Sequence, residues 1–309
     1  MVALSSIASA FGDWHDLDAY DESGVLFDAL LADGFERFAV SKDDVTALAL
    51  SAAQQTLEAW PHDRESISAF IFFTDEVGDL DGRNSDKAIL QHHRLRKRLF
   101  DGLAALGLKC AYPMGVWLSG CSNALAALLQ AKSLIDAGLA RHVLVLGGDR
   151  SPHGQTRITG RADAPLGIRS DGGVAFVASA DGPIALCGSA LIGNLEIIQP
   201  YEQHLYGEYM VGMGRSLMQL RERFDAGHTL SAGSYDVVTT ANYLSSAVAT
   251  YLMPCGLALG KLGLPTKAGG HNVCSDILRN IEILTETSPK VLTFWPSAFG
   301  WALAAFERH

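Results

Sequence analysis

The sequence predicts an α/β protein, and three observations lead to this class. Short apolar runs alternate with longer helical segments along the chain, as in a sheet with helices packed on it. The chain has 31 glycines in 309 residues, and glycine is frequent in the tight turns that join strands to helices. Hydrophobic residues make up 48% of the chain and charged residues 19%, which excludes a disordered protein. A chain of this length buries a core without disulfide or metal cross-links.

The predicted strands are short apolar runs bounded by turn residues. In order they are residues 67–73, 143–146 (ending in Gly147-Gly148-Asp149), 174–178, 237–239, 291–295 and 302–306. The run at 174–178 follows the turn Ser170-Asp171-Gly172-Gly173, which typically separates two extended segments.

The predicted helices lie between these strands. In order they are residues 42–60, 86–106, 121–137, 209–224, 242–259 and 272–284. Ser41 is the expected N-cap of the first helix. In the third, Leu125, Leu128 and Ile135 fall on one face, and Gly138 is expected to end the helix.

The order of strands and helices is similar in the two parts of the chain, which indicates a pseudo-duplicated protein. The expected boundary is the turn Asp181-Gly182-Pro183. It divides the chain into an N-terminal half, residues 1–182, and a C-terminal half, residues 183–309.

The segment around Cys121 carries the clearest chemical signal. An apolar stretch runs into the small-residue turn Ser119-Gly120-Cys121, and a long apolar helix is expected to begin at the cysteine. A helix N-terminus carries partial positive charge and unpaired N–H groups, and both stabilise a thiolate. A backbone N–H in such a turn also donates to an oxyanion. The pattern is typical of a nucleophile, and a buried structural cysteine is the alternative.

Four landmarks along the chain resemble the thiolase superfamily and, within it, β-ketoacyl-ACP synthase III. They are SGCSNALAALLQAKSLIDAG followed by HVLVLGGD, the turn SDGGVAFVAS, the loop GGHNVCSD and the closing segment FWPSAFGWALAAFER. The resemblance implies a thiolase-like α/β fold, with two pseudo-duplicated halves in a layered αβαβα arrangement. It also implies a dimer in which strands of the N-terminal half pair across a two-fold axis.

The resemblance implies a catalytic cysteine, histidine and asparagine. Cys121 matches the cysteine that takes the acyl group, and Asn272 matches the asparagine that helps to stabilise a thioester enolate. Thr239 stands where the family has its histidine, because the following Ala241-Asn242 aligns with the family's pattern. Threonine cannot replace an imidazole as acid or base at neutral pH, although its hydroxyl can donate one hydrogen bond.

Other residues are candidates to complete the site. His271 lies beside Asn272 and is a candidate base, although adjacent loop residues usually point apart. His153 follows a predicted strand and is a weaker candidate, and Cys274 either shares the asparagine's side of the loop or is a small buried residue. In the closing loop, Pro296-Ser297-Ala298 replaces a run of glycines, and Ala298 is the expected second backbone donor to the oxyanion.

Loss of the histidine favours acyl transfer over decarboxylative condensation. Self-acylation needs a thiolate and an oxyanion hole, whereas condensation needs strong stabilisation of an enolate. Removing one oxyanion donor typically costs about 10²–10³ in rate. We therefore expect an acyltransferase that forms an acyl-Cys121 thioester and passes the acyl group to a small-molecule or carrier-bound acceptor, in secondary metabolism. The alternatives are a catalytically impaired subunit of a heterodimeric condensing enzyme and a condensing enzyme with a substitute base.

Charge and composition limit the partners. Lys and Arg number 24 against 34 Asp and Glu, a net charge of −10, which argues against nucleic-acid binding. The basic run from His92 to Leu99 contains Arg94 and Arg98, which we expect to bind CoA phosphates or an acidic acyl carrier protein. The alternative is a solvated helix face with Leu95 and Leu99 turned inward.

Composition also bears on cofactors and localisation. The resemblance implies a CoA or ACP phosphopantetheine thioester as the acyl donor, and no other cofactor is expected. The five cysteines lack CxxC spacing, so neither a zinc site nor a disulfide framework is expected. The apolar runs are too short to span a bilayer, and the first residues lack the basic region of a signal peptide, which predicts a cytoplasmic protein.

Overall fold

The computed structural model describes residues 2–20, 27–75, 85–151, 155–161, 164–229, 231–272 and 275–309. Its main element is a nine-stranded mixed sheet with the order β11-β12-β13-β10-β1-β9-β6-β4-β5. These strands are β1 (Val2–Phe11), β4 (Ile67–Phe73), β5 (Tyr112–Val116), β6 (His142–Asp149), β9 (Gly172–Ser179), β10 (Ile184–Gly193), β11 (Val237–Thr239), β12 (Lys290–Trp295) and β13 (Gly300–Arg308). Two small two-stranded antiparallel sheets accompany it, β2 (Asp13–Asp16) with β3 (Arg37–Val40), and β7 (Ile158–Arg161) with β8 (Ala164–Ile168).

The two parts of the sheet repeat one topology. In the first part, β4 runs parallel to β6, β6 antiparallel to β9, and β9 antiparallel to β1. In the second part, β11 runs parallel to β12, β12 antiparallel to β13, and β13 antiparallel to β10. The antiparallel pair β1 and β10 joins the two parts at the centre. The turn between β9 and β10 contains the division expected between residues 182 and 183, whose standing as a domain boundary remains a prediction.

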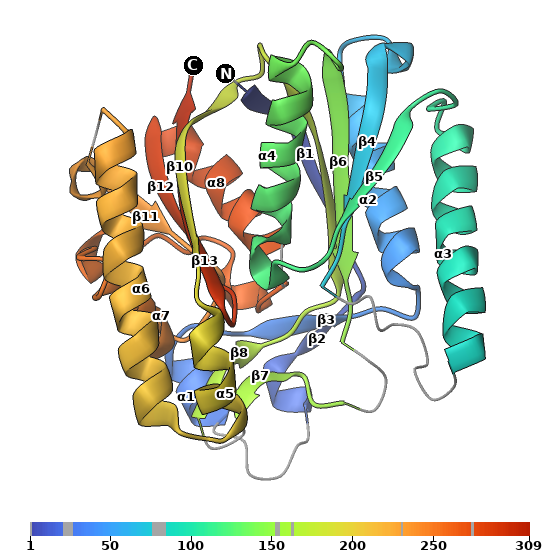
Figure 1. Ribbon diagram of the computed structural model, residues 1–309. Helices are drawn as coiled ribbons and strands as arrows, with labels where there is room; N and C mark the ends of the chain where they lie inside the picture. The colour runs from blue at the N-terminus through green and yellow to red at the C-terminus, as the bar shows by residue number, and fades with distance from the viewer. Residues whose placement is uncertain are drawn as a thin grey trace.

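The helices complete five layers, seen edge-on in Figure 1. Their bounds are α1 (Phe27–Ala32), α2 (Val45–Ala59), α3 (Ser85–Ala105), α4 (Asn123–Asp136), α5 (Ile198–Glu202), α6 (Tyr206–Gly227), α7 (Ser245–Leu252) and α8 (Ser275–Thr287). Helix α2 packs on the outer face of β1, β6 and β9, with α3 beside it, and α6 packs on the outer face of β10 and β13. Helices α4 and α8 lie between the two parts of the sheet.

The predicted apolar strands are present, and most of them are a few residues longer than the predicted runs. The predicted helices are shifted by a few residues at their ends, and two of them differ further. Helix α2 is capped by Asp44, whose side chain accepts from the amide of Ala47, and not by Ser41. Helix α7 is eight residues long, much shorter than expected, because Pro254 lies two residues beyond its end and Gly256 has a φ of +63°.

Strands β1 and β10, at the centre of the sheet, were not predicted from the sequence. Both are rich in small residues, and β1 contains a bulge at Ser6, where φ is +52°. The main core nevertheless forms around them, because the apolar faces of α4 and α8 are buried between the two parts of the sheet.

Candidate active site

Cys121 lies in a turn at the head of the inner helix α4. Gly120 has a φ of +53°, a conformation that side chains other than glycine rarely adopt, and a 3₁₀ turn over Gly120–Ser122 leads into the helix. The buried Asn123 fixes this turn: its Oδ1 accepts from the amide of Ser119 at 2.8 Å, and its Nδ2 donates to the Thr74 carbonyl at 3.0 Å. The structure thus places the predicted nucleophile at a helix N-terminus.

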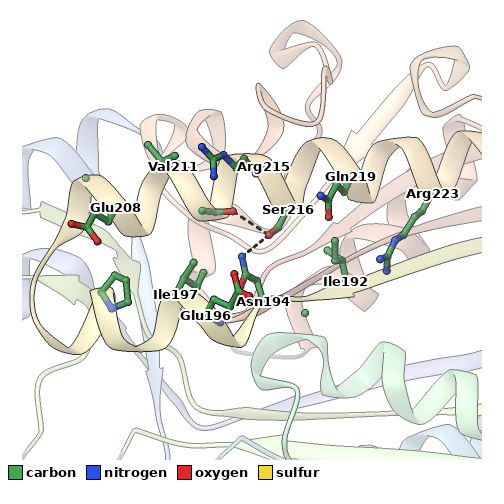
Figure 2. Close-up of a pocket in the computed structure, with 14 residues that line it drawn as sticks. Ile192, Asn194, Glu196, Ile197, Glu208, Val211, Arg215, Ser216, Gln219 and Arg223 are labelled. Atoms are coloured by element: carbon green, nitrogen blue, oxygen red, sulfur yellow. Dashed lines mark hydrogen bonds between the residues drawn. The ribbon is translucent and has the colours of Figure 1, made fainter.

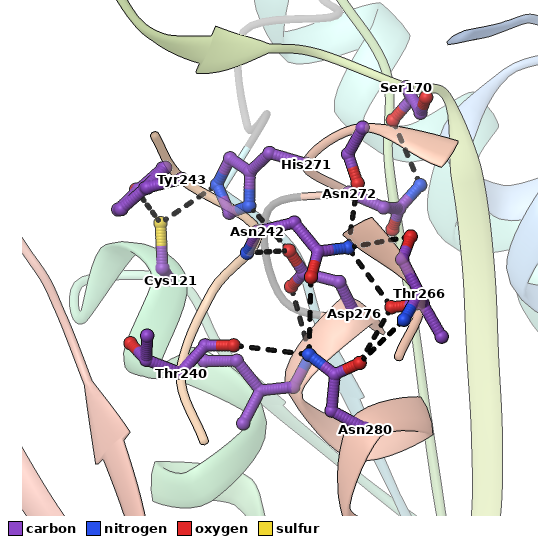
Figure 3. A network of polar contacts seen from close by, with 12 residues as sticks. Cys121, Ser170, Thr240, Asn242, Tyr243, Thr266, His271, Asn272, Asp276 and Asn280 are labelled. Atoms are coloured by element: carbon purple, nitrogen blue, oxygen red, sulfur yellow. Dashed lines mark hydrogen bonds and ion pairs between the residues drawn. The ribbon is translucent and has the colours of Figure 1, made fainter. Parts of the chain in front are cut away.

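Three side chains form a hydrogen-bonded chain that starts at this cysteine (Figure 3). The Sγ atom of Cys121 is 3.5 Å from Nε2 of His271. On the other side of the imidazole, Nδ1 lies 2.8 Å from Oδ2 of Asp276. Both His271 and Asp276 are buried, whereas Cys121 is half-buried. A nucleophile, a base and a carboxylate that orients the base are the components of a catalytic triad.

The backbone of the loop that precedes α8 determines where His271 points. Gly270 has a φ of +75°, and its carbonyl accepts from the Asn242 side chain at 2.9 Å. The amide of His271 donates to the Ile168 carbonyl at 2.7 Å. The backbone amide of Asn242 donates to Oδ2 of Asp276 at 2.7 Å. Asn242 therefore positions both the loop, through its side chain, and the carboxylate, through its backbone.

The charge of Asp276 favours the protonated form of His271. Burial opposes protonation, but the nearby carboxylate and the cysteine sulfur outweigh it and raise the pKa of His271 to about 10. The geometry therefore supports an imidazolium that faces the sulfur at neutral pH, which is the arrangement that activates a cysteine nucleophile.

Tyr243 is a further site residue, and no sequence pattern marks it. Its hydroxyl lies 3.4 Å from Sγ of Cys121, and its ring centroid lies 4.6 Å from that of His271. The side chain is buried. A single tyrosine after Asn242 has no distinctive sequence pattern, so only the three-dimensional structure identifies it.

Asn272 and Thr239 do not contact Cys121 through the hydrogen bonds of the described residues. The Nδ2 atom of Asn272 donates to the Ser170 carbonyl at 2.9 Å, and its Oδ1 is buried without a partner. The hydroxyl of Thr239 is likewise buried without a partner. Of these two adjacent loop residues, His271 is the one whose side chain contacts the cysteine. The catalytic roles first suggested for Asn272 and Thr239 remain predictions without a supporting contact.

The closing loop reaches the cysteine turn through Ser297. A Cβ atom on Gly120 would lie 3.0 Å from Oγ of Ser297, and Oγ of Ser122 is 3.2 Å from the Trp295 carbonyl. Ala298 is exposed, and its carbonyl accepts from the hydroxyl of Tyr209 at 3.2 Å. Its role as an oxyanion donor stays a prediction.

The basic cluster lies on α3, an outer helix, whereas Cys121 precedes α4, which is an inner helix (Figure 1). Arg94 is exposed, and Arg98 forms an ion pair with Asp44. Leu99 is buried and Leu95 is half-buried, as a solvated helix with an inward apolar edge requires. Ligand binding by Arg94 and Arg98 remains a prediction.

The remaining candidates are placed as follows. His153 and Cys274 lie outside the described residues. Cys110, Cys121, Cys187 and Cys255 are free thiols. Within the described ranges, His, Cys, Asp and Glu side chains form no group of three or more that could hold a metal. Among the helices that the structure describes, none is both long and apolar enough to cross a membrane.

Two cavities have linings that do not include the triad. A groove of about 700 Å³ runs between α6 and the segment around α5, where Asn194 donates to Ser216 at 3.0 Å (Figure 2). A second cavity of about 480 Å³ lies between α3 and the outer face of the sheet and is lined mainly by apolar side chains, among them Phe70 and Leu99. Neither is lined by Cys121 or His271.

The fold resembles solved structures over nearly the whole chain. ChlB3, an acyltransferase, matches with a TM-score of 0.76 and 16% identity, covering 99% of this chain and 97% of that one. The 3-oxoacyl-[acyl-carrier-protein] synthase III of Aquifex aeolicus matches at 0.70 and 14%, covering 99% and 100%. The type III polyketide synthase domain of Steely1 from Dictyostelium matches at 0.72 and 11%, covering 99% of each chain. No family model and no curated protein sequence matches the chain.

At these identities the likeness establishes the fold, and it agrees with the repeated strand topology and the two inner helices. The chain therefore has a thiolase-like α/β fold, as the four sequence landmarks imply.

Proposed function

We propose that the protein is an acyltransferase of the ketoacyl synthase III type that forms an acyl-Cys121 thioester. The observation that carries the proposal is the chain Cys121–His271–Asp276, with contacts of 3.5 Å and 2.8 Å at a helix N-terminus. Several solved structures with this fold are condensing or acyl-transferring enzymes by name, which supports the same class of chemistry.

The triad performs the transfer in two steps. In the first, the Cys121 thiolate attacks the thioester carbonyl of the donor. The bond between that carbonyl and the donor sulfur then breaks, and the donor thiolate takes the proton from Nε2 of His271. In the second, neutral His271 accepts the proton of an acceptor hydroxyl or amine as the acceptor attacks the acyl carbon. The bond to Sγ breaks, and the thiolate–imidazolium pair is restored.

The arrangement favours acyl transfer over decarboxylative condensation. A histidine bound to a carboxylate is a better base than an isolated imidazole, and a base is what a hydroxyl or amine acceptor requires. Stabilising an enolate instead requires donors aimed at its oxygen. One hydrogen of the Asn272 side-chain amide is donated to the Ser170 carbonyl, and no hydrogen bond of the described residues joins Asn272 to Cys121. The complete triad within one chain also argues against an impaired subunit of a heterodimer.

The donor in this proposal is an acyl-CoA or an acyl carrier protein, and the acceptor is a small or carrier-bound hydroxyl or amine of secondary metabolism. The cations of α3, Arg94 among them, are proposed to attract the acidic surface of a carrier protein. The active form is proposed to be a cytoplasmic homodimer.

The test is intact-mass analysis after brief incubation with a panel of acyl-CoA and acyl-ACP thioesters, followed by an acid quench. We expect the wild type to gain the mass of one acyl group, and Cys121→Ala to gain none. Cys110→Ala is the matched control, because Cys110 is an exposed free thiol outside the site and its removal leaves acylation unchanged.

Three results would contradict the proposal. The first is acylation of Cys121→Ala to the same extent as the wild type. The second is the absence of a mass gain with every donor, which would point to dependence on a second thiolase-fold chain. The third is malonyl-ACP decarboxylation by the isolated protein at the rate of an ordinary condensing enzyme.

A further inference from the structure

Two groups, and not only the imidazole, contact the nucleophilic sulfur. His271 approaches Sγ of Cys121 at 3.5 Å, and the hydroxyl of Tyr243 approaches it at 3.4 Å (Figure 3). A thiolate accepts hydrogen bonds from both, because a phenol and an imidazolium are donors. The triad uses the contact between Cys121 and His271 and gives the contact between Cys121 and Tyr243 no role.

The position of the hydroxyl is fixed by the surroundings of Tyr243. The side chain is buried, with 5% of its surface exposed, and its ring packs on the imidazole of His271 at an interplanar angle of 58°. The backbone is held on both sides, because the Tyr243 amide donates to Ala241 at 2.7 Å and the next amide, of Leu244, donates to Leu166 at 2.6 Å. The Tyr243 side chain is therefore already held in place, and its hydroxyl contacts the sulfur without further loss of side-chain freedom.

We propose that Tyr243 is a catalytic residue that donates a hydrogen bond to the Cys121 thiolate, both before it attacks the donor and when it leaves the acyl-enzyme. This proposal rests on the acyl transfer proposed above and assigns a further group to the same site. The tyrosine transfers no proton: its O–H bond stays intact while the bond between Sγ and the acyl carbon forms or breaks.

The charges around the sulfur are consistent with a donor at this position. Burial and the nearby sulfur raise the pKa of Tyr243 well above its ordinary value, so the phenol keeps its proton. Asp276 lies behind the imidazole, with its Oδ2 2.8 Å from Nδ1 of His271. The phenol adds to this charged arrangement a donor that itself carries no charge.

The hydrogen bond has opposite consequences for the two roles of the sulfur. It stabilises the thiolate, which increases the reactive fraction at neutral pH and makes Cys121 a better leaving group. It also lowers the intrinsic nucleophilicity of the thiolate, because nucleophilicity falls with basicity. If Tyr243 had only a packing role, its replacement would not lower the thiolate fraction while keeping or raising the nucleophilicity of the thiolate.

The experiment compares Tyr243→Phe with the wild type, because phenylalanine keeps the ring on His271 and removes only the hydroxyl. Iodoacetamide alkylation of Cys121 is followed as a function of pH. We expect the midpoint of the profile to move up by about one pH unit, or about tenfold in thiolate stability, with a plateau at high pH that is equal or higher. Hydrolysis or transfer from a preformed acyl-enzyme is expected to slow about tenfold.

The matched control is Tyr235→Phe, since Tyr235 is also a buried phenol of the C-terminal half but does not contact the sulfur. Its alkylation profile is expected to coincide with that of the wild type. If Tyr243→Phe does not fold, as judged by thermal unfolding, 3-fluorotyrosine at position 243 replaces it. Because this phenol is more acidic, it donates a stronger hydrogen bond to the Cys121 thiolate. We expect the midpoint of the alkylation profile to move to lower pH.

A Tyr243→Phe profile that coincides with the wild type, or a 3-fluorotyrosine profile that does not move, overturns the proposal. Alkylation uses no acyl donor, so this result is independent of whether any thioester in the panel acylates Cys121. The tyrosine proposal and the acyltransferase proposal therefore fail separately.

Discussion

The Asp276 carboxylate determines which form of His271 meets the nucleophile. Its Oδ2 accepts from the imidazole at 2.8 Å and from the backbone amide of Asn242 at 2.7 Å, so it is held from two directions. Although burial disfavours a charged imidazole, this carboxylate and the cysteine sulfur raise the pKa of His271 to about 10. As the pH rises through neutrality, the imidazolium keeps its proton and continues to stabilise the thiolate.

Asp276→Asn should reverse this effect, because the amide keeps an oxygen at the same place but carries no charge. The pKa of His271 falls, so the imidazole loses its proton at lower pH and the thiolate loses its charged partner. We expect the alkylation profile of Cys121 to move to higher pH, and acylation at pH 7 to slow by about 10²–10⁴.

The control for this variant is Asp101→Asn, which removes a carboxylate from the exposed Lys97–Asp101 pair on α3. It leaves both the profile and the acylation rate unchanged. Equal profiles for Asp276→Asn and the wild type would show that the carboxylate does not govern the charge of His271.

At the level of single residues, the sequence predicts part of this site. The small-residue turn and the apolar helix identify Cys121, because both features are local. The choice between His271 and Asn272 is not local: it depends on Gly270, with its φ of +75°, and on the contacts of this loop with Asn242 and Ile168. The contact between Tyr243 and Cys121 joins positions 122 residues apart and leaves no pattern in the chain.

At the level of elements, both ends of α4 depend on glycines with positive φ, but only one of these glycines touches the closing loop. Gly120 has a φ of +53° and would place a Cβ 3.0 Å from Ser297 Oγ. Gly138, beyond the other end, has a φ of +68° and open space around it. An alanine at either position would have a strained backbone. Only at Gly120 would its methyl group also contact a residue next to the active site.

Replacing either glycine by alanine is expected to lower the free energy of unfolding by about 1–2 kcal/mol, the cost of a left-handed conformation. Thermal unfolding measures that loss for both variants. Gly120→Ala is also expected to slow acylation, because the added methyl group displaces Ser297 or the cysteine turn, whereas Gly138→Ala acylates at the wild-type rate. Equal acylation rates for the two variants would show that the turn tolerates the methyl group.

Among the elements, those with a strong local pattern were predictable. The run ISAFIFF matches β4 from Ile67 to Phe73, because apolar β-branched and aromatic residues fit a buried strand. The sequence of β1, VALSSIASAF, lacks that pattern, and its position between β9 and β10 comes from pairing with distant segments. The end of α7 is likewise set by the turn at Gly256 and not by hydrophobic periodicity.

At the level of the whole molecule, the site is assembled from both parts of the fold. Cys121 comes from the head of α4 in the first part, and His271 and Asp276 come from the head of α8 in the second. The two inner helices thus bring together residues that neither part supplies alone. The repeated topology explains why the acid–base group and the nucleophile lie just before the N-termini of equivalent helices.

The edge strand β5 offers a surface for the proposed homodimer. It lies at one end of the sheet, with Tyr112 69% exposed, and the adjoining Trp117 and Leu118 are 53% and 90% exposed. Apolar side chains exposed together at a sheet edge are typical of an association surface.

Light scattering is expected to give twice the chain mass of 33.0 kDa, and the double variant Tyr112→Glu with Leu118→Asp is expected to give the monomer mass. The paired control changes Leu139 and Leu195 to Asp, since both are exposed away from β5, and it retains the dimer mass. A wild-type monomer would contradict the homodimer.

The central position of β1 also has a consequence for how the chain is made. Residues 2–11 are synthesised before their sheet partners β9 and β10, with Ala3 opposite Ser179 and Val2 opposite Leu186. At a synthesis rate of about 5–20 residues per second, this segment waits on the order of 10–40 s for them. The sheet therefore cannot close until β9 and β10 have been translated, and a binding factor for the nascent segment would act in that interval.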